Sequence, residues 1–268
     1  NIIDLKEQSM ICTRKEREDL EKMAATRRDV QSFGISDIGL SRANNEDAWK
    51  EIPEKRFYAL ADGMGGHNAG EIASYTAVES ICSSIQELPS IESIQELLKH
   101  MKKAVYQANK TVLQKAKQAK EYKGMGTTLC CFMLFDDYLV YAHVGDSRLY
   151  RIRNRIEQLT KDHKIRHIQW GQPSDGSKHT RPLLFRNVIT RAIGTHIEVE
   201  PDVGSYGVQS GDIYLLCSDG LSNLVNDEAI HSILKLPCSL EVKGNQLLQK
   251  ALKNGGHDNI TLLLVNIL

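Results

Sequence analysis

The sequence contains no apolar run long enough to cross a lipid bilayer. Its longest apolar stretch, residues 128–144, is interrupted by Asp136 and Asp137, whereas a membrane-spanning helix needs about 20 predominantly apolar residues. The charged N-terminal segment also lacks the apolar core of a signal peptide. We therefore expect a cytoplasmic chain without a membrane segment.

An excess of either charge is missing too. Lys and Arg together number 34, and Asp and Glu also number 34, so the net charge of zero argues against a dedicated nucleic-acid binder. No Cys-x-x-Cys pair occurs among the six cysteines, which indicates reduced, mostly buried thiols. No internal repeat or linker divides the chain. We expect a charged N-terminal extension, residues 1–30, followed by one domain, residues 31–268.

The spacing of apolar residues predicts an α+β fold. Two consecutive long helices follow the first strands, which favours helices packed together on a sheet over a ladder of βαβ units. We therefore expect antiparallel sheets in the middle and helices outside. Strands are expected at residues 30–38, 57–61, 127–135, 138–144, 148–153, 156–159, 213–217 and 260–267, helices at about 70–88, 91–112, 227–236 and 244–253, and loops over 160–203.

Aspartates recur where apolar strands are expected to end. Asp62 follows the apolar residues 57–61 and precedes a glycine-rich turn; Asp146 and Asp219 also follow apolar runs, and Asp258 precedes one. A single aspartate at such a position is most often a turn or cap residue, but four recurrences are less readily explained that way. If the strand ends meet at one rim, the carboxylates repel one another unless cations neutralise them.

The types of side chain around these aspartates favour a hard cation. Asp47 adds a fifth carboxylate, and Cys217, two residues before Asp219, is the one cysteine within ten residues of any of the five. Oxygen ligands of this kind suit Mg²⁺ or Mn²⁺ better than Zn²⁺. His163 and His167 have the spacing of two metal ligands on a helix, but without a third ligand signature a solvated pair is the better interpretation.

Several short motifs occur in a fixed order: Arg42-x-x-Asn45-Glu46-Asp47, Ala61-Asp62-Gly63-Met64-Gly65-Gly66-His67, Gly126-Thr127-Thr128, Val144-Gly145-Asp146-Ser147-Arg148, Ala192-Ile193-Gly194, Ser218-Asp219-Gly220 and Asp258-Asn259. This ordered set resembles the bacterial type 2C (PPM-like) metal-dependent Ser/Thr protein phosphatases from about residue 31 to the C-terminus. The fold of that family is a central sandwich of two antiparallel β-sheets flanked by pairs of antiparallel helices, which agrees with the expected elements.

The resemblance implies two or three Mn²⁺ or Mg²⁺ ions held by carboxylates. Asp62 would bridge the first two ions, which activate a water molecule near neutral pH. The Gly63 carbonyl oxygen is a further implied ligand of one of these ions, and Asp219 and Asp258 are implied ligands of the other. Asp146 and Asp219 would bind the third ion. Glu46 and Asp47 would hold metal-bound water or support the centre.

Two further residues follow from the resemblance. Arg42 lies four residues before Glu46, which is the family spacing of the arginine that binds the substrate phosphate, and a guanidinium suits bidentate phosphate recognition. Met64 stands where many eukaryotic relatives carry a histidine thought to protonate the leaving group. His67, three residues later, is a weaker candidate for that acid.

The implied function is metal-dependent hydrolysis of phosphoserine or phosphothreonine in proteins. The expected partners of this monomer are phosphorylated proteins, the substrates of a Ser/Thr kinase. The alternative is a catalytically silent scaffold that binds phosphoproteins or a kinase, and the complete set of aspartates favours the enzyme. A two-metal nuclease would need a basic channel; the neutral net charge counts against it, whereas the local positive charge of residues 160–191 keeps this alternative open.

The segment expected to be rich in loops corresponds to the mobile flap of the family. Residues 170–176 break the helical pattern expected there. Residues 160–191 contain seven basic and two acidic side chains, a local charge of +5. Either this segment is a merely soluble loop, or the flap attracts acidic or multiply phosphorylated protein segments.

Overall fold

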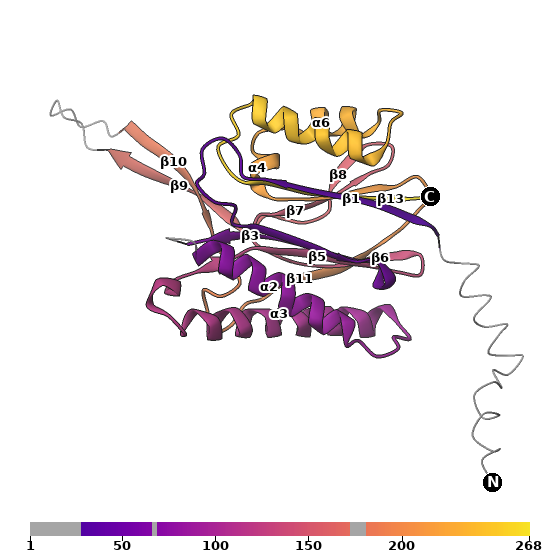
Figure 1. Ribbon diagram of the computed structural model, residues 1–268, viewed down its shortest axis with the longest axis horizontal. Coiled ribbons are helices and arrows are strands. Elements are labelled where there is room, and N and C mark those ends of the chain that lie inside the picture. Colours follow the sequence, from indigo (N-terminus) through magenta and orange to yellow (C-terminus); the bar gives the residue numbers. More distant parts are fainter. Residues whose placement is uncertain (1–27, 66–68, 172–180) are drawn as a thin grey trace, which may run out of the picture.

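The computed structural model describes residues 28–65, 69–171 and 181–268, without the side chains of residues 166–171 and 181–187. Two antiparallel β-sheets lie face to face in the middle of the molecule, and helices cover the outer face of each sheet (Figure 1). The predicted α+β sandwich flanked by helix pairs is therefore confirmed.

The lower sheet in Figure 1 has six strands. Its main path runs β11-β6-β5-β3-β2, and the short β4 pairs with the end of β3. Asp136, at a positive φ of 48°, lies in the turn between β5 and β6, where the hairpin was predicted. The strands are β2 (Asp47–Ile52), β3 (Phe57–Met64), β4 (Gly126–Thr127), β5 (Leu129–Phe135), β6 (Tyr138–Val144) and β11 (Asp202–Gly207).

The upper sheet has five strands in the order β1-β13-β12-β7-β8. β13 pairs with β1 on one side and β12 on the other, and it is buried along almost its whole length. Both of its faces are covered, which explains why its sequence is continuously apolar instead of alternating. The strands are β1 (Val30–Asp37), β7 (Arg148–Ile152), β8 (Ile156–Gln158), β12 (Ile213–Cys217) and β13 (Ile260–Ile267).

Helix pairs cover the outer faces, as predicted. The side chain of Ser93 accepts the backbone N–H of Glu96 at 3.2 Å and caps the first turn of the long helix on the lower sheet. Buried side chains then recur every three or four residues along this helix, as an amphipathic helix requires. The helices are α2 (Ala69–Gln86) and α3 (Ile94–Ala116) on the lower sheet, and α5 (Asp227–Leu234) and α6 (Leu240–Lys253) on the upper sheet.

Clusters of buried apolar side chains fill the spaces between the four layers. One cluster lies between each helix pair and its sheet, and another lies between the two sheets. In the cluster between the sheets, the ring of Phe132 lies 5.0 Å from that of Tyr58 and 5.8 Å from that of Tyr214, measured between centroids. Because Tyr214 belongs to the upper sheet, these aromatic contacts join the two sheets.

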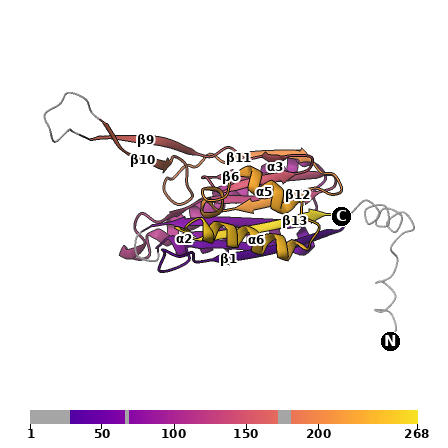
Figure 2. The same ribbon diagram turned by 90° about the horizontal axis from the view of Figure 1, so that it is seen from above.

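A two-stranded hairpin extends beyond the body of the sandwich (Figures 1 and 2). It consists of β9 (Lys164–Gly171) and β10 (Arg181–Ile189). The expectation of a loop-rich flap over residues 160–203 is therefore wrong: the segment contains paired strands, and residues on both sides of them, such as His163 and Ile193, are buried in the body. The sequence of this segment is rich in β-branched and aromatic residues, which favour strands.

Other parts of the chain also refine the expectations. β2 and β11 were not predicted as strands. β1 begins at Val30. The guanidinium of Arg28 donates to the carbonyl oxygen of Val208 at 2.8 Å, whereas most of the expected extension lies outside the described residues.

None of the helices in the described ranges combines the length and apolarity of a membrane span. Cys82, Cys130, Cys131 and Cys217 are buried free thiols, and Cys12 lies outside the described part of the chain.

Candidate metal centre

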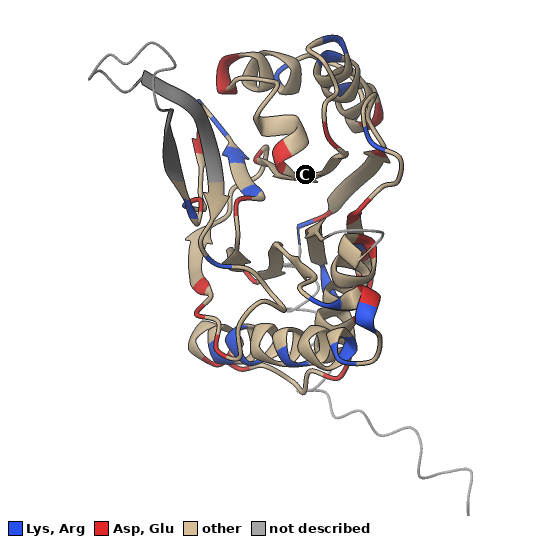
Figure 3. Ribbon diagram, turned by 90° about the vertical axis from the view of Figure 1, so that its left-hand side faces the viewer, with Lys and Arg blue, Asp and Glu red and all other residues tan. Residues whose placement is uncertain are grey.

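Strand ends from both sheets meet at the end of the sandwich from which the hairpin extends. Figure 3 looks onto this end, with α2 and α3 at the bottom and α5 and α6 at the top. The five aspartates singled out in the sequence come together here, since the other four each raise the pKa of Asp62 by their negative charge. They are Asp47 at the start of β2, Asp62 within β3, Asp146 after β6, Asp219 at the start of the short helix α4 (Asp219–Ser222), and Asp258 before β13.

Two threonines hold the backbone of Asp62. The backbone N–H of Asp62 donates to the hydroxyl oxygen of Thr128 at 2.8 Å. The carbonyl oxygen of Asp62 accepts the hydroxyl of Thr127 at 2.8 Å and the backbone N–H of Thr128 at 2.9 Å. The Thr128 hydroxyl also lies 2.6 Å from that of Ser147, so the β3 end is linked to the residue next to Asp146.

Close backbone packing explains the glycine after Asp62. The N–H of Gly63 donates to the carbonyl oxygen of Glu46 at 3.0 Å. A Cβ atom on Gly63 would collide with the carbonyl oxygens of Glu46 and Gly70. Only glycine permits this approach of three backbone segments, and Glu46 is thereby held beside the start of α2.

Ser218 connects Asp47 of the lower sheet to the upper sheet. Its hydroxyl donates to Oδ2 of Asp47 at 2.8 Å and accepts the backbone N–H of Thr261 at 3.0 Å. Asp47 lies directly opposite Asp62 in the β2–β3 ladder. The register of that ladder therefore places both carboxylates at the same site.

Asn259 fixes the loop that carries Glu46. Its side-chain oxygen accepts the N–H of Glu46 at 2.8 Å, and its amide nitrogen donates to the carbonyl oxygens of Ile38 and Asn44 at 2.9 and 3.0 Å. The preceding residue, Asp258, accepts a hydrogen bond from the guanidinium of Arg42 at 2.7 Å. The Arg42 loop is thus held against the start of β13.

Burial and mutual repulsion raise the pKa values of the carboxylates. Burial raises the pKa of Asp62 well above its ordinary range, and Asp47 makes the next contribution. Burial also raises the pKa of Asp47 to about 7, although Ser218 and Thr261 oppose it, and raises that of Asp219 to about 6 with a further contribution from Asp146. These carboxylates cannot all be ionised near neutral pH without a cation.

Two carboxylate oxygens show that this chemistry fits divalent ions. Oδ1 of Asp47 and Oδ1 of Asp146 are buried and accept no hydrogen bond from the described residues. Such an unsatisfied acceptor is costly unless it gains a partner, and a hard cation is the partner that carboxylate oxygens prefer. The donor set therefore fits ions such as Mn²⁺ or Mg²⁺.

A family model described as protein phosphatase 2C matches residues 41–254. The chain belongs to the protein phosphatase 2C family. The membership that the ordered motifs predicted is therefore confirmed.

Known members of the protein phosphatase 2C family match most of this chain. Serine/threonine phosphatase stp of Listeria monocytogenes is 36% identical over 238 residues, which cover 86% of this chain and 93% of that protein. Serine/threonine protein phosphatase PstP of Mycobacterium tuberculosis is 37% identical over 235 residues, which cover 87% of this chain and 44% of PstP.

Solved structures agree with these sequence matches. The catalytic domain of PstP in complex with two manganese ions gives a TM-score of 0.74 at 34% identity and covers 89% of this chain and 98% of that domain. The S. agalactiae serine/threonine phosphatase gives a TM-score of 0.78 at 32% identity and covers 90% of this chain and 100% of that structure.

Several residues that hold the aspartate cluster in place had no role assigned from the sequence. Thr127, Thr128, Ser147, Ser218 and Asn259 lay within the quoted motifs, and for the last three a position next to an aspartate was the only further signal. Their roles depend on hydrogen bonds between distant segments, which sequence spacing does not show. His67, the weaker candidate for the acid, lies outside the described residues.

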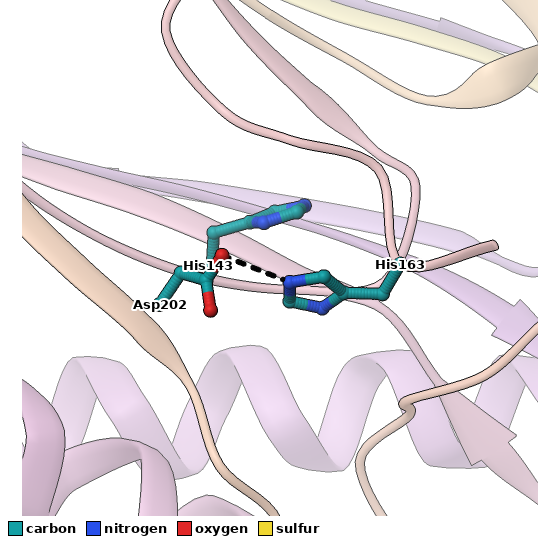
Figure 4. A group of neighbouring side chains, drawn as sticks. All are labelled: His143, His163 and Asp202. Atoms are coloured by element: carbon teal, nitrogen blue, oxygen red, sulfur yellow. Dashed lines mark hydrogen bonds and ion pairs between the residues drawn. The ribbon is translucent and has the colours of Figure 1, made fainter.

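Figure 4 shows a second group of potential ligands, which is linked to the turn before Asp146. Ligand atoms of His143, His163 and Asp202 all lie within 4.8 Å of one another. Nδ1 of His163 accepts the N–H of Gly145 at 3.1 Å, so the proton of this ring must be on Nε2, which faces Oδ2 of Asp202 at 3.1 Å. A protonated nitrogen cannot bind a metal, and Asp202 also accepts a hydrogen bond from Arg191 at 2.8 Å.

We therefore interpret this group as support for the turn before Asp146. The expectation of a solvated histidine pair is wrong for His163, which is buried, and nothing is described of the His167 side chain. Burial lowers the pKa of His143 to about 4, and His163 contributes next, so His143 is neutral near pH 7.

The basic residues of the flap are only partly available to a substrate. Lys164 pairs with Asp162 at 2.9 Å, and Arg191 pairs with Asp202 at 2.8 Å. Lys178 lies outside the described residues. Attraction of acidic substrates by this segment stays a prediction, with fewer free charges than the local value of +5 suggested.

Proposed function

We propose that this chain hydrolyses phosphoserine and phosphothreonine in proteins, with Mn²⁺ or Mg²⁺ bound at the aspartate cluster. The observation that carries the proposal is the meeting of carboxylates from both sheets around Asp62, whose pKa is raised by burial and by the other carboxylates. Membership of the protein phosphatase 2C family supports it, as does the complex of the related PstP catalytic domain with two manganese ions.

The ligands that we propose follow from this arrangement and from the resemblance. Bound divalent ions lower the pKa of a water molecule and neutralise phosphate charge. Thr127 and Thr128 orient Asp62 through its backbone, and close packing at Gly63 leaves no room for a side chain there. The proposed ligands are Asp62, the Gly63 carbonyl oxygen, Asp219 and Asp258 for two ions, and Asp146 with Asp219 for a third, supported by Glu46 and Asp47.

Arg42 is the residue that we propose for binding the substrate phosphate. Its side chain is 48% exposed, and the carboxylate of Asp258 to which it donates is 36% exposed. An exposed pair of this kind contributes little to stability, so the guanidinium can exchange the carboxylate for a phosphate group at small cost. His67 remains a sequence-based candidate for protonating the leaving group.

Phosphate release with and without metal tests the proposed function. We expect Mn²⁺-dependent release from p-nitrophenyl phosphate and from a phosphothreonine peptide, and none in EDTA. Glu241→Ala, which removes an exposed carboxylate on α6, is the control and should behave like the wild type. Metal-dependent binding of the peptide without release would instead support the scaffold.

The cellular setting belongs to the same proposal. The substrates would be proteins phosphorylated by a Ser/Thr kinase, and the enzyme would act as a cytoplasmic monomer in phosphorylation signalling. A phosphoprotein substrate requires no membrane or nucleic-acid partner. Sedimentation of the purified chain tests the monomer, because a concentration-independent mass of about twice the 30.1 kDa of one chain would contradict it.

A further inference from the structure

Lys164, the first residue of β9, lies against the carboxylate of Asp146. Its ammonium nitrogen is 3.7 Å from Oδ2 of Asp146 and 2.9 Å from Oδ2 of Asp162. The side chain of Lys164 is 17% exposed and that of Asp146 is 4% exposed. A positive charge from the base of the hairpin thus stands beside a carboxylate of the proposed metal centre.

The partners of Asp162 show why the charge of Lys164 is available to Asp146. The guanidinium of Arg148 donates to both oxygens of Asp162 at 2.8 to 3.2 Å, and the amide of Gln158 adds a hydrogen bond at 2.9 Å. The charge of Asp162 is therefore already balanced by Arg148, in a bidentate geometry that favours a stable pair. Lys164 contacts Asp162 as well, but Asp162 does not depend on it, so the charge of Lys164 is available to Asp146.

Hydrogen bonds of His163 fix the position of Lys164 relative to Asp146. The N–H of His163 donates to the carbonyl oxygen of Gly145 at 2.7 Å, and its ring accepts the N–H of Gly145 at 3.1 Å. Its carbonyl oxygen accepts the N–H of Thr190, which follows β10, at 2.8 Å. Both ends of the hairpin are therefore fixed to the turn that carries Asp146.

We propose that Lys164 is a tethered cation that competes with a divalent ion for Asp146. An ammonium and a divalent ion repel each other strongly within a few ångströms in a partly buried site, so both cannot stay at this carboxylate. Lys164 has a long flexible stem, and its backbone belongs to the hairpin. The position of the hairpin would then set the affinity for an ion at Asp146 without changing the ions at Asp62. This inference rests on the proposed function, because it concerns the third ion of that centre.

Removal of the lysine charge tests the competition. Lys164→Met keeps most of the length of the stem and removes the ammonium. In calorimetric titrations with Mn²⁺, we expect the tightly bound ions to be unchanged, while the weakest ion binds about tenfold more tightly than in the wild type. Adding Asp146→Asn should abolish that gain. The matched control is Lys161→Met, which removes the charge of an exposed lysine in the same segment and should change no affinity.

Thermal unfolding without metal provides a second readout. Lys164→Met should lower the metal-free Tm, because a buried carboxylate loses its counter-charge, and Mn²⁺ should restore it; Lys164→Gln serves in the same way if the methionine variant folds poorly. Equal affinity for the weakest ion in wild type and variant, with the tight ions bound, would overturn the role of Lys164 alone. Absence of Mn²⁺ binding in both proteins would overturn the role of Lys164 and the proposed function together.

Discussion

Two groups of aspartates in this molecule are removed from water: Asp162 and Asp212 each face an arginine, whereas Asp62 faces other carboxylates. Asp162 faces Arg148, and Asp212 accepts two hydrogen bonds from Arg153 at 2.6 and 2.7 Å. Burial alone would raise the pKa of either carboxyl group, yet the hydrogen bonds from these arginines lower it. At Asp62 no arginine opposes the effect of burial: burial and the neighbouring carboxylates both raise the pKa.

The difference separates carboxylates that stabilise the fold from carboxylates that need a bound cation. Asp212 also accepts the hydroxyl of Tyr214 at 3.0 Å and the N–H of Gln209 at 2.9 Å, so its charge is satisfied within the chain. Oδ1 of Asp146 accepts no hydrogen bond from the described residues. Carboxyl groups whose pKa values are strongly raised, as at Asp62, are typical of functional sites.

The largest expected effect comes from Asp62. Asp62→Ala should reduce kcat by roughly a thousandfold or more and remove Mn²⁺ affinity, because the proposed bridging ligand is lost. The metal-free free energy of unfolding should stay the same or rise, since a cluster of like charges is relieved. Steady-state kinetics, Mn²⁺ titration and urea unfolding measure the three quantities. Substantial activity in this variant would contradict the assignment.

Asp212 should behave in the opposite way. Asp212→Asn should lower the free energy of unfolding by about 2 kcal/mol, because Arg153 loses its partner and the buried hydrogen bonds change. Mn²⁺ affinity and KM should not change. Urea unfolding with and without Mn²⁺ measures the effect, and a loss of metal affinity without a loss of stability would show that the two groups of aspartates are not distinct.

The stability of the metal-free protein should depend on pH through both groups of aspartates, those of the cluster and those that face an arginine. The folded-state pKa values of Asp47 and Asp219 are raised to about 7 and about 6, while an unfolded aspartate titrates near about 3.9. Between about pH 4 and pH 7 the folded state holds more protons, so its stability falls as the pH rises. Asp162 and Asp212 have lowered pKa values, so their contribution is present above about pH 4 and is lost below it.

The metal-free Tm should therefore be highest near about pH 5 and fall by several degrees toward about pH 7.5. Saturating Mn²⁺ should remove most of that fall, because the ions neutralise the carboxylates. Differential scanning fluorimetry across this range, with EDTA or Mn²⁺, tests the prediction. A metal-free Tm that rises between those two pH values would contradict it.

The smallest effect on stability is expected at Arg42, an arginine whose aspartate partner is exposed. Arg42→Ala should change the free energy of unfolding by less than about 0.5 kcal/mol. KM should rise by about tenfold with a smaller loss of kcat, if the phosphate contact is similar in the ground and transition states. Should kcat alone collapse, Arg42 would instead stabilise charge that develops during transfer.

The sandwich could be predicted because its strands and helices carry strong local patterns. The hairpin of residues 127–144 and the continuously apolar β13 are evident within short windows of sequence, and the aspartate motifs singled out carboxylates that the structure brings together. The prediction missed β2, whose sequence from Asp47 to Ile52 alternates too weakly to stand out. Its position is set by pairing with β3, which is a tertiary effect.

Contacts across the base of the hairpin explain the remaining errors. His163 and Lys164 look like solvated polar residues in their local sequence. They are held by Gly145 and Asp146, which lie 18 residues earlier in each case, and spacing along the chain does not encode such contacts. The flap was likewise expected to be loops because Pro173 and Gly176 interrupt it, although its flanks favour strands.

The aspartate cluster draws residues from both sheets, since Asp47 and Asp62 belong to one and Asp219 and Asp258 flank strands of the other. An ion bound among them would cross-link the two sheets at this end, whereas Phe132 joins them through aromatic contacts in the interior. Local opening of the sandwich at the ends of β3 and β13 would then require release of the ion. Amide hydrogen exchange there should slow in proportion to metal occupancy, so that affinity and local rigidity are two measures of one equilibrium.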